Sequence, residues 1–253
     1  MLSDLLELNI FGFFLIFARI GSAIGMMPGF SSSFVSPRFS LAIALAVSFV
    51  ASPPLVSTLP VMPSSVVSLS LLLIGEILIG AFLGTIARTL ISGLQTAGTI
   101  IAFTSSLANA MTNDAISAQQ SSTISAFFMT AGMVLVFVSD LHHLMLIAVV
   151  DSYSLFVPGE GLLIDDMSHF MTRKLADSFA LALQMSAPFL IVSLTYYIGL
   201  GLLGRLMPQL QVFFFGMPFQ IAAQLWVLAI TTSGILMVFV SNFQDVYTSF
   251  TLE

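Results

Sequence analysis

Long apolar segments alternate with shorter polar ones along almost the whole of the 253-residue chain. A helix needs about 20 mainly apolar residues to cross the hydrocarbon core of a bilayer. By this measure the sequence predicts six membrane helices, or seven if the moderately apolar piece 91–103 forms a helix of its own instead of extending the third. The six segments are Ile10–Pro28, Phe39–Leu59, Val66–Ile91, Ile124–Val150, Ser178–Leu203 and Ile221–Val240. We therefore expect an all-α, polytopic membrane protein with about six long helices arranged in hairpins.

The longest polar run in this apolar sequence is residues 105–125, SSLANAMTNDAISAQQSSTIS, here called the central polar segment. Its only charged residue is Asp114, and it contains no Pro, Gly, Lys or Arg. Lipid cannot satisfy the hydrogen bonds of such a run, so the run must reach water or be shielded by protein. Two interpretations stay open: a solvated loop between two membrane helices, or a segment that lines or fills a watery cavity.

Composition supports a membrane protein and excludes several other classes. Hydrophobic residues make up 58% of the chain and charged residues 7%, whereas a soluble domain has about a quarter charged residues. The net charge of −6 provides no basic patch for nucleic acid. Without cysteine the chain has neither disulfides nor thiolate metal sites. No soluble-looking block interrupts the sequence, and its first residues lack the basic region of a signal peptide. We therefore expect one membrane domain over residues 1–253, without a removable leader.

Two ionisable residues, Arg19 and Glu76, lie inside apolar segments. A charge at the centre of a membrane helix costs at least ~2.5 kcal/mol on insertion scales, so each needs a partner, a water path or a place outside lipid. One interpretation makes Arg19 and Glu76 an ion relay, and a secondary transporter that uses Glu76 and Arg88 is the rival function. The other makes Arg19 and Glu76 a structural pair, or contacts to neighbouring subunits. We favour the second, because one acid and one base do not make a relay.

Asp140, His142 and His143 form a group of residue types that bind metals. Adjacent histidines on a helix point about 100° apart, however, and do not easily hold the same ion. The only other histidine, His169, is distant in sequence. From the sequence we therefore expect satisfied polar groups in a buried interface, and no metal or other cofactor. Nucleophile-elbow, phosphate-loop and zinc-protease motifs are also missing, so an enzyme is not expected.

The stretch 204–220, GRLMPQLQVFFFGMPFQ, carries two prolines around an aromatic cluster. Pro208 and Pro218 are expected to interrupt the helices and to form a bend. The bend is either a membrane hairpin tip with interfacial aromatic residues or a docking edge for another protein.

Four motifs in this order and spacing resemble the FliR family of flagellar export-gate proteins, which is related to the SctT subunit of virulence type III secretion systems. The resemblance covers nearly the whole chain, with departures at Leu141, Ala115, Gln211 and Gln220. The four motifs are Phe17-Ala18-Arg19-Ile20 followed by Pro28, Phe30 and Pro37-Arg38; the run Gly98–Ser125 with Asp114; Asp140-Leu141-His142-His143 followed by Ser152 and Pro158; and Gly204-Arg205-Leu206-Met207-Pro208-Gln209-Leu210-Gln211-Val212-Phe213 followed by Gly216 and Pro218.

The resemblance implies a non-enzymatic subunit of the flagellar protein export gate, in the bacterial inner membrane within the basal body. It implies a hetero-oligomer with P-type and Q-type subunits (FliP-like and FliQ-like), with one copy of this chain per complex. FlhB-like and FlhA-like export components and exported unfolded proteins are the further partners that it implies. A subunit of a virulence export system is the nearest alternative.

The resemblance also assigns roles along the chain. Residues 1–175 are expected to form P-like helices, with a plug in segment 105–125, and residues 176–253 a Q-like helical hairpin. The expected plug residues are Met111, Thr112, Asn113, Asp114, Gln119 and Gln120. The expected assembly residues are Arg19, Glu76, Asp140, His142 and His143. The expected tip of the C-terminal hairpin, at the cytoplasmic entrance, consists of Arg205, Pro208, Gln211, Phe213, Phe214 and Pro218.

Overall fold

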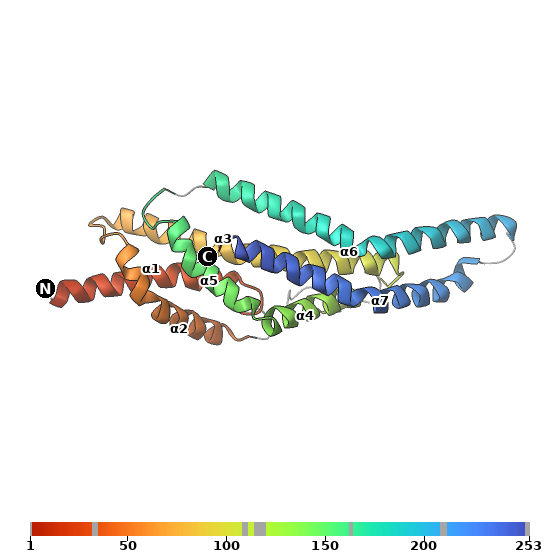
Figure 1. Cartoon of the computed structure of the whole chain (residues 1–253), viewed down its shortest axis with the longest axis horizontal. Coiled ribbons are helices and arrows are strands. Elements are labelled where there is room, and N and C mark those ends of the chain that lie inside the picture. The colour runs from red at the N-terminus through yellow and green to blue at the C-terminus, as the bar shows by residue number, and fades with distance from the viewer. Residues whose placement is uncertain are drawn as a thin grey trace. The chain divides into compact units, whose positions relative to one another are not determined.

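The structure, a computed structural model, is almost entirely helical (Figure 1). It describes residues 2–31, 35–107, 111–113, 120–161, 164–207 and 212–250. Within them, the only strands form one short antiparallel ladder, which pairs Met111 with Ser122 and Asn113 with Gln120. The elements are α1 (Leu2–Met26), α2 (Pro37–Leu55), the 3-10 turn η1 (Val56–Thr58), α3 (Val66–Thr104), β1 (Met111–Asn113), β2 (Gln120–Ser122), α4 (Thr123–Val138), α5 (Leu141–Leu155), α6 (Ile164–Leu206) and α7 (Val212–Thr248).

The described helices include four that are long and apolar enough to cross a membrane, and a fifth if the bent pair α4 and α5 is one span. This confirms the polytopic all-α class, with fewer clear spans than the six expected. The apolar part of the first helix, Ile10–Met26, is shorter than a full span. It stops before Pro28, which disfavours helix at the residue that precedes it, and Gly29 then turns the chain at φ 93°. The four helical spans are Pro37–Thr58, Val66–Thr104, Ile164–Leu206 and Gly216–Thr248.

The expected single helix over Ile124–Val150 is wrong. The chain breaks between α4 and α5, which are bent by 71° relative to each other and are separate helices in Figure 1. Asp140 lies at the break in the left-handed conformation, with φ 56° and ψ 14°. Asp visits this region more readily than most residues, and a left-handed residue cannot continue a right-handed helix.

Two other helices are longer than their apolar cores. The piece 91–103 extends α3 to Thr104, as one of the two sequence interpretations expected. Helix α6 begins at Ile164, well before the predicted Ser178. Its first turns are amphipathic, and Asp165 and Asp166 lie in the first turn, where negative charge interacts favourably with the helix dipole.

The chain divides into two compact units, and most of the long helices contribute to both. Unit 1 consists of Met1–Leu90, Val136–Lys174 and Asn242–Glu253, and unit 2 of Ile91–Leu135 and Leu175–Ser241. The division into P-like helices over residues 1–175 and a Q-like hairpin over residues 176–253 stays a prediction.

Helices α1 and α3 approach closely within unit 1. A Cβ atom on Gly80 would collide with the Arg19 carbonyl oxygen and the Ser22 hydroxyl, and one on Gly84 would lie 2.6 Å from the Ala23 carbonyl oxygen. Small residues allow such close backbone approach between membrane helices. These two glycines therefore allow the central part of α3 to lie against the C-terminal half of α1, where Arg19 lies.

Candidate functional site

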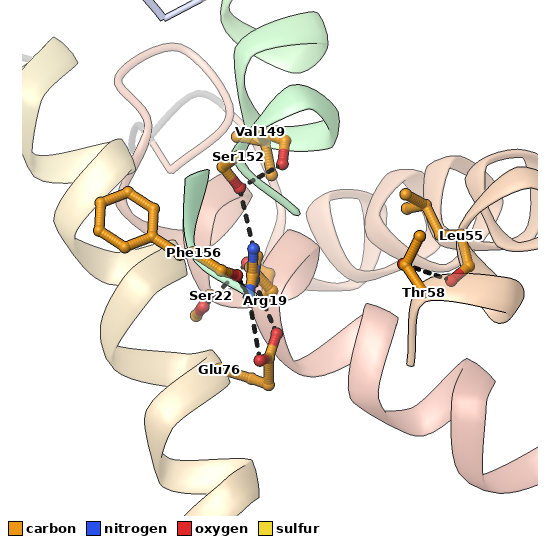
Figure 2. Close-up of polar contacts among 8 residues, drawn as sticks. All are labelled: Arg19, Ser22, Leu55, Thr58, Glu76, Val149, Ser152 and Phe156. Atoms are coloured by element: carbon orange, nitrogen blue, oxygen red, sulfur yellow. Dashed lines mark hydrogen bonds and ion pairs between the residues drawn. The ribbon is translucent and has the colours of Figure 1, made fainter. Parts of the chain in front are cut away.

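A buried polar cluster surrounds Arg19 in unit 1 (Figure 2). The Arg19 guanidinium donates from Nε to Glu76 Oε2 at 2.7 Å and from Nη2 to Glu76 Oε1 at 2.9 Å. The side chain of Arg19 is 0% exposed and that of Glu76 is 2% exposed. A two-point contact of this kind is the strong form of an arginine–carboxylate pair. It joins α1 to α3, as one of the two sequence interpretations expected, and the structural role of the pair stays a prediction.

The rest of the guanidinium is satisfied by α5 and the turn that follows it. Nη1 donates to Ser152 Oγ at 3.1 Å, and Nη2 donates to the Phe156 carbonyl oxygen at 2.8 Å. The Tyr153 ring lies 3.8 Å from the guanidinium carbon, which makes a cation–π contact. We call Arg19, Glu76, Ser152, Tyr153 and the Phe156 carbonyl the Arg19 cluster. It ties three helices of unit 1 together in a place where an unpaired charge would be costly.

The structure does not bring Glu76 together with Arg88. Both lie on α3, and the helical rise separates them by roughly 18 Å. Arg88 is exposed, whereas both carboxylate oxygens of Glu76 bind Arg19. The two residues of the rival transporter hypothesis, Glu76 and Arg88, are therefore not in contact with each other.

In unit 2 the two ends of the central polar segment are held by hydrogen bonds. The Thr104 carbonyl, at the end of α3, accepts from Gln220 Nε2 at 2.9 Å and from Ser193 Oγ at 3.3 Å. Carbonyls in the last turn of a helix have no partner within the helix, so such donors satisfy them. Gln220 also bonds the Tyr197 hydroxyl at 3.0 Å.

The other end of the segment is attached to α3 at the start of α4. Ser125 Oγ donates to the Gln95 carbonyl oxygen at 3.0 Å. A Cβ on Gly98 would lie 2.6 Å from the Ser125 Cα, so only glycine fits there without a shift. The Ser122 hydroxyl accepts from the Ser125 amide at 3.1 Å, as a capping residue does.

The expected plug residues are placed in part. Met111, Thr112 and Asn113 form β1, and Gln120 begins β2. Asp114 and Gln119 lie outside the described residues. The two strands were not expected from the sequence, because the alternation of a three-residue strand is too short to recognise.

The residues of the expected hairpin tip are described only in part. Arg205 is exposed in the last turn of α6, while Pro208 and Gln211 lie outside the described residues. Phe213 and Phe214 belong to the first turn of α7. Pro218 does not interrupt the helix as expected: α7 runs through it from Val212. Pro218 lies in the second turn of α7, and it leaves the Phe214 carbonyl without an amide partner in the helix.

Asp140, His142 and His143 come together at the α4–α5 break in unit 1. Asp140 and His143 are exposed by 78% and 65%, so they are not buried within this chain. One potential ligand atom from each of the three residues lies within 4.8 Å of the others. The expectation that the two histidines diverge is therefore wrong for this geometry.

Sequence reasoning missed several polar residues that the structure uses. Gln224 donates to the Phe189 carbonyl at 3.2 Å, next to Pro188, which lies inside α6. The available signal was an isolated glutamine in an apolar helix, but a single polar residue does not indicate its partner. The same holds for Ser193 and Gln220.

Sequence comparison with known proteins identifies the family. The profile of the family described as "Bacterial export proteins, family 1" matches residues 10–246. The flagellar biosynthetic protein FliR of Caulobacter vibrioides is 32% identical, over 94% of this chain and 94% of its own length. The chain belongs to the FliR family of bacterial export proteins. Proteins of the same name from Bacillus subtilis (28% identity, 89% of this chain and 88% of the relative) and Escherichia coli (30%, 79% and 76%) are similar too. The resemblance identified in the sequence is thereby confirmed, and the Arg19 cluster lies within the matched residues of this FliR-family chain.

Proposed function

We propose that this chain is a subunit of the flagellar type III protein export gate. In this role it helps to form the inner-membrane pore through which unfolded flagellar proteins leave the cell. The proposal is supported by membership of an export family and by relatives that carry the name flagellar biosynthetic protein. The names of these relatives favour a flagellar system over a virulence system. Four apolar helices of spanning length fit a position in the membrane.

The observation that carries the proposal is the tethering of the central polar segment at both ends. The Thr104 carbonyl is bonded by Gln220 and Ser193 at one end, and Ser125 is bonded to Gln95 at the other. Between these points the chain is polar, although α3 and α4 on either side are strongly apolar. A polar segment with fixed ends is suited to close a watery pore and to move without unfolding the helices that hold it.

The weak ladder between β1 and β2 is consistent with a gate that opens repeatedly. It pairs only Met111–Asn113 with Gln120–Ser122. Each exchanged hydrogen bond contributes about 0.5–1.5 kcal/mol net, far less than a packed apolar core. We therefore assign Met111, Thr112, Asn113, Asp114, Gln119 and Gln120 to the plug.

In this proposal the partners are FliP-like and FliQ-like subunits in the gate, with FlhB-like and FlhA-like components docking on it. One copy of this chain would be present in each complex. A broad set of apolar side chains stays exposed on the described helices, as it must on a surface that faces lipid or partner subunits. The assembly can be tested by affinity purification in mild detergent. Recovery of two further small membrane proteins in a stable complex is expected, and a lone monomer would contradict the proposal.

The plug is tested by ion conductance in cells that express the gate without the rest of the export machine. Deletion of Met111–Gln119 should leave the complex assembled but make the membrane leaky to small ions. A second variant replaces the same residues by a Gly–Ser stretch of equal length, which keeps the connection and removes the native side chains. It should leak as well. A solvated loop predicts normal assembly and a tight membrane for both variants, and that result would reject the plug.

A further inference from the structure

At the break between α4 and α5, the Asp140 side chain does not cap the helix that follows it. An Asp that precedes a helix normally caps it by accepting from an amide in the first turn. Asp140 occupies the cap position of α5, yet its side chain makes no capping hydrogen bond. Its carboxylate oxygen Oδ1 lies instead 3.5 Å from His143 Nδ1. The left-handed backbone at Asp140 thus turns the carboxylate toward the imidazoles.

The two histidines are neighbours in space as well as in sequence. Their ring centroids lie 4.1 Å apart, with an angle of 36° between the ring planes. Phe137 stacks on His142 at 5.0 Å and 28°, and Phe30 packs edge-on against Phe137 at 5.8 Å. These aromatic contacts hold the His142 ring in its orientation.

One nitrogen of this group needs a partner. His142 Nδ1 is buried, and within the described part of the chain it has no hydrogen-bond partner. Buried polar atoms in folded proteins are nearly always satisfied, and the exceptions call for an explanation such as an ion or water. An unprotonated imidazole nitrogen is also the form that binds a metal ion.

We propose that Asp140, His142 and His143 form a binding site for a divalent transition metal ion, Zn²⁺ in the first instance. Two imidazoles and one carboxylate suit Zn²⁺, Co²⁺ or Ni²⁺ better than Ca²⁺ or Mg²⁺, which prefer oxygen ligands. Three protein ligands leave a fourth position for water or for a group from another chain. This site is independent of the proposed export function.

The geometry requires only a small closure. Bonds of about 2.0–2.2 Å around a tetrahedral ion place ligand atoms roughly 3.3 Å apart. The three ligand atoms now lie within 4.8 Å of one another. The exposed side chains of Asp140 and His143 have room to rotate inward, while His142 stays against Phe137. A bound ion would connect the left-handed residue to the first turn of α5 and thereby stabilise the bend.

The site can be tested with the full-length chain purified in detergent with a tag that contains no histidine. Zn²⁺ is titrated against a chromophoric chelator, and Co²⁺ is added separately for its visible d–d absorption. The test variants are Asp140→Asn and His143→Gln, because both side chains are exposed and neither carries the core. The matched controls are His169→Gln and Asp165→Asn, exposed positions on α6.

One equivalent of Zn²⁺ should bind to the wild type and to both controls. Each test variant should lose at least ~10-fold in affinity, since even indirect partners of a metal ligand cost that much. Co²⁺ should give a tetrahedral-type spectrum that Asp140→Asn and His143→Gln abolish. Thermal melting without metal shows that the variants are folded. Absence of stoichiometric binding in the wild type, or equal affinity in folded test and control variants, would overturn the proposal.

Discussion

Arg19 of α1 and Glu76 of α3 meet through two hydrogen bonds, of 2.7 and 2.9 Å, in the interior of unit 1. The pair is closed off from solvent, and the remaining contacts of the guanidinium come from α5 and the turn after it. A buried pair of this kind is a weak source of net stability, but breaking it is costly because one charge stays behind. The pair therefore makes the packing of α1, α3 and α5 specific.

Arg19→Leu should destabilise unit 1 by about 3–5 kcal/mol, because Glu76 would be left buried without its partner. The measurements are thermal melting of the purified chain and the yield of the assembled complex. Glu76→Leu combined with Arg19→Leu should recover a large part of the loss, since an apolar pair leaves no unpaired charge. Arg88→Leu, at an exposed position of α3, is the control. A normal yield for Arg19→Leu would refute a structural role for the pair.

Gly80→Ala should destabilise the chain by about 1–3 kcal/mol through overpacking. The added methyl group would collide with the Arg19 carbonyl and would separate α1 from α3. Gly75→Ala is the matched control on the same helix, because nothing lies within 4 Å of its Cβ position. That change should be neutral or should stabilise by up to ~1 kcal/mol through helix propensity. Equal melting temperatures for the two variants would contradict the close approach.

Gln220→Leu should loosen the end of α3 and increase the basal ion leak of the assembled gate. The expected loss of stability is about 0.5–1.5 kcal/mol for the bond to the Thr104 carbonyl. Gln224→Leu removes a similar bond, to Phe189, at a point away from the central polar segment. It should cost comparable stability without the leak. Identical conductance in the two variants would show that the Gln220 tether does not control the segment.

Replacement of Phe213 and Phe214 by Ser should reduce the docking of an FlhB-like or FlhA-like component and leave the core complex intact. Aromatic residues are frequent anchors of protein interfaces, and these two begin α7 after the connection from α6. Phe219→Ser on the same helix, 74% exposed, serves as the control. Co-purification of each component with the complex is measured. Unchanged association of every partner would remove the docking role.

The apolar pattern predicted the long helices well, because their length and apolar composition are enough to identify them. It placed the cores of α2, α3, α6 and α7, and it singled out Arg19 and Glu76 because ionisable groups are rare in such segments. It also suggested that the two form a pair, but it could not predict the contacts of Arg19 with Ser152 and Phe156, since these join helices that are distant in the chain. The apolar pattern also does not indicate which buried polar groups contact one another.

The predictions that were wrong failed for reasons local to each part of the chain. The bend at Asp140 depends on one left-handed residue that is neither Gly nor Pro, so nothing in the sequence marked it. The start of α6 was missed because its first turns are amphipathic and hydropathy detects only apolar helix. Pro218 was overrated as a breaker, because a proline inside a helix removes one backbone hydrogen bond without always ending the helix.

The bond from Ser125 to the Gln95 carbonyl fixes the distance between the two ends of the chain segment that follows α3. A segment with fixed ends behaves as a closed loop, whose entropy changes only slowly with the number of residues. Doubling its length costs about 0.6 kcal/mol. The stability of the surrounding helices therefore depends only weakly on the length of this segment. In the proposed export gate, insertions and deletions there would change the bore of the pore and the ease of opening while the surrounding helices keep their fold.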